Sequence, residues 1–171
     1  IMVGTGVGAK NGVLFQSAEA LENLHNVNAV IMDKTGTVTE GRPVVTDVKS
    51  FGVEPGDLLS LALSLELRSD HPLADAIVRY TRSKNAKERA VTGFEMIEGQ
   101  GIRADIDGVH CLSGNRRMLL ANGLALSRSA QQMGDDLAKA GKTPLYFAAN
   151  RQVVGIFAVA DVLKATSRDA V

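Results

Sequence analysis

Residues 27–37 read Val27-Asn28-Ala29-Val30-Ile31-Met32-Asp33-Lys34-Thr35-Gly36-Thr37, and this stretch carries the first prediction of a fold. Its first six residues form an apolar, β-branched run of strand length, which predicts a buried strand of a parallel sheet. Asp33 would then lie at the carboxyl end of that strand, where open α/β sheets bind their ligands. Gly36 lets the backbone turn sharply, so that N–H groups can face a phosphate. The stretch therefore predicts an α/β domain in which Asp33 is a candidate nucleophile toward a phosphoryl group.

The residue two positions after Asp33 limits the reaction that this loop can perform. A phosphatase with such a loop needs a second carboxylate there, to deprotonate the water that releases the phosphate. This chain has Thr35 at that position, and threonine cannot act as the base. We therefore expect an aspartyl-phosphate that forms but hydrolyses slowly. The plainer alternative is an acidic turn that only caps a strand.

Length and composition restrict the class of protein. The chain has 171 residues, 45% hydrophobic and 22% charged, with a net charge of zero. Without a basic excess or Trp, and with 4% aromatic residues, we expect no nucleic-acid partner. The single cysteine excludes an internal disulfide and a cysteine zinc cluster. No apolar run approaches the roughly 20 residues that span a bilayer. Because the sequence begins with Ile1 and ends with Val171, we expect a piece of a longer protein.

After Pro43 the pattern of the sequence changes. Turn signals at Asp107-Gly108 and Asn150-Arg151 separate paired apolar runs and predict two hairpins. Further strands are expected over 44–53 and 91–97, and helices over 58–67, 73–84, 115–120 and 130–140. We therefore predict an α+β domain inserted into the loop after the strand at 27–32. The expected boundaries are a host domain over 1–42, the insert over 43–154, and the returning strand of the host over 155–171.

Two motifs in the insert are candidates for holding a nucleotide, since the chain has no phosphate-binding loop of the G-x-x-x-x-G-K-[ST] type. His71 precedes Pro72 at a helix start, where its ring could stack on an adenine or form a hydrogen bond to it. Gly99 and Gly101 lie between two predicted strands and would let the backbone approach a ligand closely. Each motif alone is more often a helix cap or a turn.

The motifs together carry a resemblance to a known family. Asp33-Lys34-Thr35-Gly36-Thr37, with His71-Pro72-Leu73 and Gly99-Gln100-Gly101-Ile102 downstream, resembles the heavy-metal-transporting P-type ATPases of the haloacid dehalogenase superfamily. The resemblance implies an α+β nucleotide-binding domain, an antiparallel sheet flanked by helices, inserted into a partial α/β haloacid-dehalogenase-like phosphorylation domain. Asp70 stands where the family usually has glutamate, which keeps the charge.

The resemblance also implies roles for single residues. Asp33 would be the phosphorylated residue, assisted by Lys34, Thr35 and Lys164, and Asp33 with the Thr35 carbonyl would contribute to a Mg²⁺ site. The residues implied to contact ATP are Glu66, His71, Gly99, Gly101 and Asn115. Without the family, Glu66 would be a helix-surface carboxylate, Asn115 a helix cap and Lys164 a surface lysine, and these alternatives stay open.

The function implied is that of the cytoplasmic, ATP-binding part of a membrane pump, with ATP and Mg²⁺ as cofactors. Its partners would be the rest of the pump, namely the transmembrane, actuator and remaining phosphorylation domains. We expect the transported metal to bind elsewhere and the chain alone to be inactive or nearly so. Copper is the expected cargo, because Val3-Gly4-Thr5-Gly6 with Gly8-Ala9 resembles copper pumps more than zinc or cadmium ones. The alternatives are a haloacid-dehalogenase phosphatase with a cap domain and a catalytically inert nucleotide-binding module.

Overall fold

The computed structural model describes residues 2–170, and the chain divides into two compact units, Ile1–Asp33 and Lys34–Val171. The first unit contains the helices α1 (Met2–Lys10) and α2 (Ala18–Asn23) and the short 3₁₀ helix η1 (Leu24–Asn26). Ser17 caps α2 by accepting a hydrogen bond from the Ala20 N–H at 3.1 Å. The glycine-rich start of the chain forms α1.

The strand predicted over residues 27–32 is wrong. These residues adopt no regular secondary structure and are exposed, Ile31 completely. A parallel strand exists only where neighbouring strands accept and donate its backbone hydrogen bonds, and no strand of the described residues pairs with this segment. Asp33 therefore follows an extended, unpaired run rather than a sheet strand.

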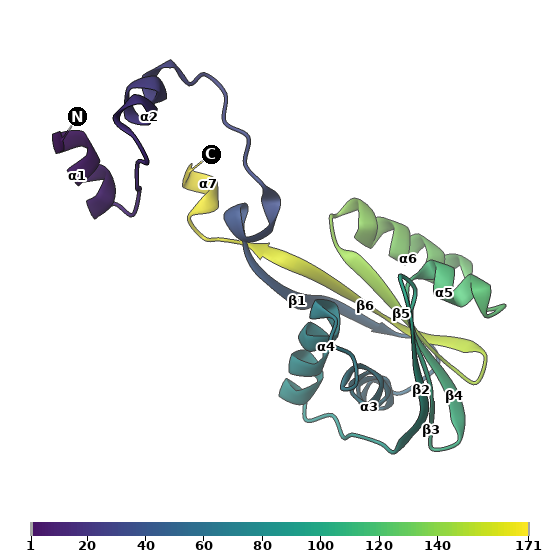
Figure 1. Ribbon diagram of the computed structural model, residues 1–171. Helices are drawn as coiled ribbons and strands as arrows, with labels where there is room; N and C mark the ends of the chain where they lie inside the picture. Colours follow the sequence, from purple (N-terminus) through teal and green to yellow (C-terminus); the bar gives the residue numbers. More distant parts are fainter. Residues whose placement is uncertain (1, 171) are drawn as a thin grey trace. The chain divides into compact units, whose positions relative to one another are not determined.

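The second unit is built on one six-stranded antiparallel sheet in the order β1-β6-β5-β4-β3-β2. Figure 1 shows the sheet with helices on both sides. Its strands are β1 (Thr39–Ser50), β2 (Val91–Ile97), β3 (Gly101–Ile106), β4 (Val109–Gly114), β5 (Thr143–Ala149) and β6 (Gln152–Leu163). This sheet and its flanking helices confirm the predicted fold class of the insert.

Each face of the sheet is covered by one pair of helices. The helices α3 (Pro55–Glu66) and α4 (Pro72–Ser83) pack on one face, and α5 (Arg116–Ala121) and α6 (Arg128–Lys139) lie on the other. Consecutive side chains of a strand point to opposite faces. Accordingly Phe147 and Phe157 join the α3–α4 core, whereas Tyr146 and Ile156 join the α5–α6 core. Double coverage explains why β5 and β6 are apolar almost throughout.

The predicted hairpins form as the turn signals indicate. Asp107 and Asn150 both adopt positive φ, the conformation that such tight turns require. The helices predicted in the insert also form, each with its bounds shifted by a few residues. The turn η2 (Lys34–Val38), in which Thr35 and Gly36 have non-helical backbone angles, precedes β1, and the short helix α7 (Ser167–Ala170) follows β6.

The strands β1 and β6 are longer than the sequence predicts. β1 and β6 pair from Thr39 opposite Leu163 to Ser50 opposite Gly155. The predicted domain boundaries, after residues 42 and 154, therefore fall inside two continuous, paired strands. The division of function between host and insert remains a prediction, and these two strands connect the proposed parts.

Candidate nucleotide pocket and phosphorylation loop

A pocket of about 500 Å³ opens at one end of the sheet, on the face that α3 and α4 cover. The end of α3, the start of α4, the β2–β3 turn and the adjoining ends of β3, β4 and β5 form its walls. All five residues predicted to contact ATP line this pocket, although they come from four separate parts of the chain: Glu66, His71, Gly99, Gly101 and Asn115. Much of the remaining wall is apolar, contributed by Leu73, Ala74, Met96, Ile97, Ile102, Pro144 and Leu145.

Glu66 is a buried carboxyl at the back of the pocket, with 4% of its surface exposed. It is the last residue of α3, and the helix-surface alternative is therefore wrong. Burial raises the pKa of Glu66 to about 7, while a hydrogen bond from the Ser113 hydroxyl opposes that rise. The pocket thus contains an acidic group that changes its charge near neutral pH.

His71 forms the N-cap of α4 and is exposed at the mouth of the pocket. Its Nδ1 accepts a hydrogen bond from the Leu73 N–H at 3.2 Å. In the neutral ring the proton is consequently on Nε2, the nitrogen available to a ligand. Pro72 at the first helical position fixes the start of α4 and leaves no additional N–H to be satisfied. Capping and ligand binding are compatible here, because they use different atoms of the ring.

Asn115 connects the β2–β3 turn to α5. Its Nδ2 donates to the Gly99 carbonyl at 2.9 Å, and its Oδ1 accepts from the Met118 N–H at 3.1 Å. Its backbone N–H also donates to the Gln100 carbonyl at 2.9 Å. Asn115 is therefore a helix cap, and it holds the glycine turn against the pocket as well. Both polar atoms of its side chain are engaged within the protein.

The two positions of the predicted motif require glycine for different structural reasons. Gly101 has a φ of +152°, and a Cβ there would lie 2.1 Å from the Ser113 carbonyl oxygen. Its cross-strand partner is also glycine, Gly114, so the two backbones approach without side chains between them. Gly99 has a φ of +65° but faces open space. Close strand packing requires Gly101, whereas the turn conformation requires Gly99.

Sequence reasoning missed Ser113 and Gly114 in this pocket. The alternation of β4 places Ser113 on the same sheet face as Cys111, which belongs to the α3–α4 core. A polar residue at a core-facing strand position was the available signal. Gly114 stood next to the predicted Asn115 without a signal of its own.

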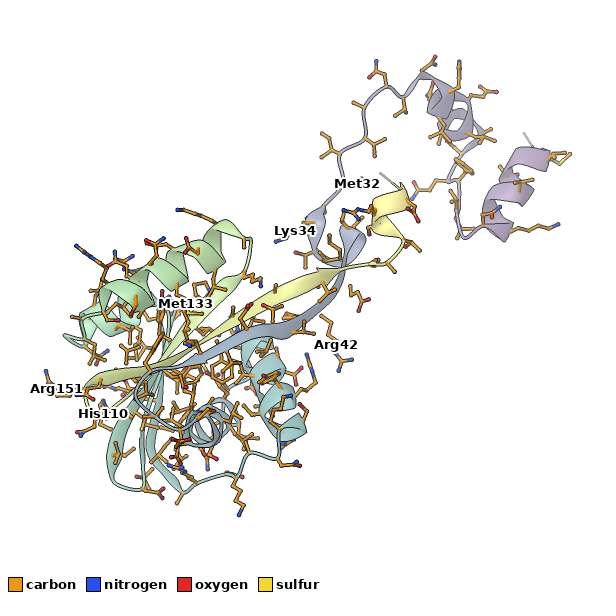
Figure 2. All side chains as sticks on the ribbon, turned by 180° about the vertical axis from the view of Figure 1, so that it is seen from behind. Met32, Lys34, Arg42, His110, Met133 and Arg151 are labelled. Carbon is orange, nitrogen blue, oxygen red and sulfur yellow. The ribbon has the colours of Figure 1, made fainter. Side chains whose placement is uncertain are left out.

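The boundary between the two units falls within the sequence Asp33-Lys34-Thr35-Gly36-Thr37, the predicted phosphorylation loop. Asp33 is exposed and ends the first unit, while Lys34 and Thr35 begin the second, within η2. Figure 2 labels Lys34 on this turn. Gly36 has a φ of +78°, the sharp turn that its sequence position predicts.

A partly buried hydrogen-bond network holds η2 to the end of β6. The Thr39 hydroxyl accepts from the Gly36 N–H at 3.1 Å and lies 3.0 Å from the Lys34 carbonyl oxygen and within hydrogen-bond range of the Asp161 carboxylate. The other oxygen of Asp161 accepts from the Arg42 N–H at 3.1 Å. Residues more than a hundred positions apart in sequence thus fix the turn that follows Asp33.

Lys164 also contacts this turn. Its Nζ donates to the Gly36 carbonyl at 2.8 Å, and its backbone N–H donates to the Val38 carbonyl at 3.0 Å. The side chain is only partly exposed. The structure therefore places the Lys164 ammonium beside η2, while its effect on a phosphoryl group stays a prediction.

Neither a metal cluster nor a membrane span is present in the part of the chain that the structure describes. No three His, Cys, Asp or Glu side chains among residues 2–170 are placed to share a metal ion. Burial raises the pKa of the Cys111 thiol to about 11, which disfavours the thiolate that binds metals. Each described helix is too short or too polar to cross a bilayer.

Comparison with known proteins agrees with this geometry. The family model for haloacid dehalogenase-like hydrolases matches residues 27–171. The chain is 44% identical over 171 residues to the "probable copper-importing P-type ATPase A" of Enterococcus hirae. The match includes all of this chain but 23% of that relative, so the chain spans about a quarter of its length.

Solved structures show the same similarity. A crystal structure of a zinc-transporting PIB-type ATPase in its E2.Pi state is similar to this chain, at 32% identity and a TM-score of 0.84. The alignment covers 99% of this chain and 27% of the zinc-transporting protein's chain. The isolated N-domain of a copper-transporting P-type ATPase matches 68% of this chain and 99% of its own, at 27% identity and a TM-score of 0.57. These matches confirm the resemblance to heavy-metal P-type ATPases that the motifs predict. By the family model that covers most of its length, the chain belongs to the haloacid dehalogenase-like hydrolases.

Proposed function

We propose that this chain is the nucleotide-binding part, with a portion of the phosphorylation domain, of a P-type ATPase that transports a heavy metal. The observation that supports it most is the convergence of Glu66, His71, Gly99, Gly101 and Asn115 on one pocket of about 500 Å³. That volume lies in the range of small-molecule sites, and an apolar wall with a few polar groups suits a purine base. His71 and Glu66 would contact the base, Gly99 and Gly101 would let the backbone approach it, and Asn115 would position the turn.

The chemistry would take place at Asp33. The strand β1 would bend near 37–43, where it leaves η2, and present the γ-phosphoryl group in line to the Asp33 carboxylate. The second position expected to bend, 154–155, lies at the opposite end of the pairing with β1, where Gly155 faces Ser50. The carboxylate oxygen would attack phosphorus, and ADP would leave. Lys164, beside η2, would offset charge on the transferring group. Thr35, which cannot act as a base, would let the aspartyl-phosphate persist until the rest of the pump acts.

Magnesium would assist this transfer by neutralising phosphate charge. Asp33 and the Thr35 carbonyl offer oxygen atoms of the kind that Mg²⁺ prefers, and they lie within three residues of one another in the sequence. Because no cluster of three potential ligand side chains is present among the described residues, the isolated chain would hold this ion weakly. We therefore expect the chain alone to bind ATP without appreciable turnover.

The names of the relatives support a proposal for the cargo and the location. The Enterococcus hirae relative carries copper in its name, and the glycine-rich start of the chain resembles copper pumps, so we propose copper. The chain would lie on the cytoplasmic face of the membrane, with the transmembrane, actuator and remaining phosphorylation domains as its partners. The metal itself would bind in the membrane part of the pump.

Calorimetric titration tests the nucleotide site. Wild type should bind ATP more tightly than GTP, and His71→Ala should weaken ATP binding about tenfold, because an exposed ring contact is lost. His110→Ala is the matched control: His110 lies beside Arg151 at a separate cavity of about 150 Å³ (Figure 2). Equal losses in both variants, or no binding by wild type, would contradict the proposed site.

A generic phosphatase is the other candidate, and its test is separate. Brisk hydrolysis of a simple phosphate ester by the chain, abolished by Asp33→Asn, would favour the phosphatase over the pump. In the intact pump, by contrast, ATP should give an acid-stable, hydroxylamine-sensitive phosphate that Asp33→Asn abolishes.

A further inference from the structure

Ser113 holds one oxygen of the Glu66 carboxylate in a fixed place. Ser113 is 1% exposed on β4, and its hydroxyl donates a hydrogen bond to Glu66 Oε1 across the boundary between sheet and helix. The two residues are 47 positions apart in sequence. This contact is not needed to complete α3 or the sheet, because it joins side chains only.

The other oxygen of Glu66 is the one left for a ligand. Within the described part of the chain, no hydrogen bond reaches Oε2, yet no fully buried side-chain N or O atom lacks a partner. Oε2 is therefore not fully buried, and Glu66 lines the pocket. A base in the pocket would meet a single carboxylate oxygen rather than both.

The charge state of Glu66 determines what that oxygen can do. An ionised oxygen only accepts hydrogen bonds, whereas a protonated carboxyl can also donate one. Burial alone disfavours the ionised form, and the hydrogen bond from Ser113 favours it. Burial, the larger effect, and the opposing hydrogen bond together bring the pKa of Glu66 to about 7, so the Ser113 hydroxyl favours the acceptor form at neutral pH.

We propose that Ser113 is a positioning residue for base specificity: by holding Glu66 Oε1, it keeps Oε2 as an acceptor that selects a 6-amino purine over a 6-oxo purine. The 6-amino group of adenine donates to an acceptor oxygen, whereas the 6-oxo group of hypoxanthine or guanine would meet it lone pair to lone pair. The inference rests on the proposed function, because it assumes that the pocket holds a purine nucleotide. It adds to that function the group that discriminates between bases.

Two other titratable side chains line the pocket, and their effects on the pH dependence of binding have to be distinguished from that of Glu66. They are His71 from the start of α4 and Glu98 from the β2–β3 turn. The β5 segment on the remaining wall, Thr143–Leu145, contains no titratable side chain. The pH dependence of binding is therefore measured in the His71→Ala and Glu98→Gln backgrounds as well.

The experiment compares ATP with inosine triphosphate, which differs at position 6 and its neighbouring nitrogen. Dissociation constants are measured between pH 6 and 9 for wild type, Ser113→Ala and Ser113→Thr. Ser64→Ala is the control, because Ser64 is an equally buried serine that bonds to backbone groups outside the pocket. A ¹³C titration of the Glu66 carboxyl in the ligand-free protein gives its pKa directly.

The expected result has three parts. In Ser113→Ala the Glu66 midpoint rises by about one pH unit, ATP affinity at pH 7 falls roughly fivefold, and the preference for ATP over inosine triphosphate shrinks by a similar factor. At pH 9 the ATP affinity returns to near the wild-type value. Ser113→Thr retains the hydroxyl and the preference, and Ser64→Ala changes stability without changing the preference.

Two outcomes would overturn the inference in different ways. If wild type binds ATP in the pocket but Ser113→Ala keeps the same base preference and the same Glu66 midpoint, the role of Ser113 is wrong and the proposed function stands. If wild type binds neither nucleotide, the proposed function is wrong, and the specificity role is wrong with it.

Discussion

The side-chain amide of Asn115 donates a 2.9 Å hydrogen bond to the carbonyl of Gly99, while the same side chain caps α5 through the Met118 N–H. One residue thus fixes both the turn that borders the pocket and the helix behind it. The effect of Asn115 on a nucleotide would consequently be indirect, through the position of Gly99.

Substitutions at Asn115 separate its two roles. Asn115→Asp keeps the acceptor for the Met118 N–H but cannot donate to Gly99, so it should retain most of the stability and lose nucleotide affinity. Asn115→Ala loses both bonds and should also destabilise the chain by about 1 kcal/mol, the usual value of a helix cap. Thermal unfolding and ATP titration of both variants check this. Equal nucleotide affinity in Asn115→Asp and wild type would show that the turn does not need the amide.

Alanine at the two motif glycines should have unequal effects. At Gly101 a Cβ would lie 2.1 Å from the Ser113 carbonyl oxygen, so Gly101→Ala must separate β3 from β4 and deform the pocket. At Gly99 the added methyl meets open space, and only the positive φ of +65° opposes it, at about 1 kcal/mol. Urea unfolding should show the larger loss for Gly101→Ala. The reverse order would contradict the close strand packing described here.

The buried Glu66 should make the stability of the chain depend on pH. Its pKa is about 7 when folded and near the ordinary value of 4.5 when unfolded, so the folded chain retains a proton that the unfolded chain has lost between these pH values. The free energy of unfolding therefore falls as pH rises from about 4.5 to 7, by an amount of order 3 kcal/mol. Glu66→Gln removes this dependence.

The measurement for Glu66 is urea unfolding at pH 5 and pH 8. Glu66→Gln should be more stable than wild type at pH 8 and close to it at pH 5. Glu98 is an exposed carboxyl on the same pocket, so Glu98→Gln is the control. Its stability should match that of wild type at both pH values. A wild-type stability that rises over this pH range relative to Glu66→Gln would show that Glu66 is ionised in the folded state.

Lys164 allows its hydrogen bond and its charge to be tested separately. Lys164→Gln retains a donor for the Gly36 carbonyl, and Lys164→Ala retains neither donor nor charge. If the charge offsets phosphate, both variants should lower phosphoenzyme formation in the intact pump about tenfold or more. Amide exchange of the η2 turn should accelerate in Lys164→Ala alone. Normal phosphoenzyme in both variants would leave Lys164 as a surface lysine that ties the turn.

The sequence predicts the second unit well because its signals are local. Asp107-Gly108 and Asn150-Arg151 specify tight turns, and Asn115 and His71 begin helices as caps, so each element is determined by a few neighbouring residues. The prediction of a strand at 27–32 was wrong because a strand depends on distant segments rather than on local signals. An apolar run becomes a strand only through distant partners, and no described segment pairs with it.

The sequence predicts the residues of the pocket that carry motifs, but not the contacts that depend on how distant strands pair. His71 and the Gly99–Gly101 pair carry motifs, and the family resemblance pointed to Glu66 and Asn115. The hydrogen bond between Ser113 and Glu66, and that between Asn115 and Gly99, depend on the register of β4 beside β3 and α3. Register arises from the whole sheet, and no short stretch of sequence contains it.

The most direct test of the account is an isotope-edited NMR titration of the chain with ATP, ADP and GTP. We expect both adenine nucleotides to bind, with the largest amide shifts at Glu66, His71, Gly99, Gly101 and Asn115, and we expect GTP to bind far more weakly. In His71→Ala these shifts should appear only at much higher ATP concentrations. Shifts located elsewhere on the second unit, or equal responses to ATP and GTP in wild type and His71→Ala, would contradict the claim that this pocket binds the adenine nucleotide.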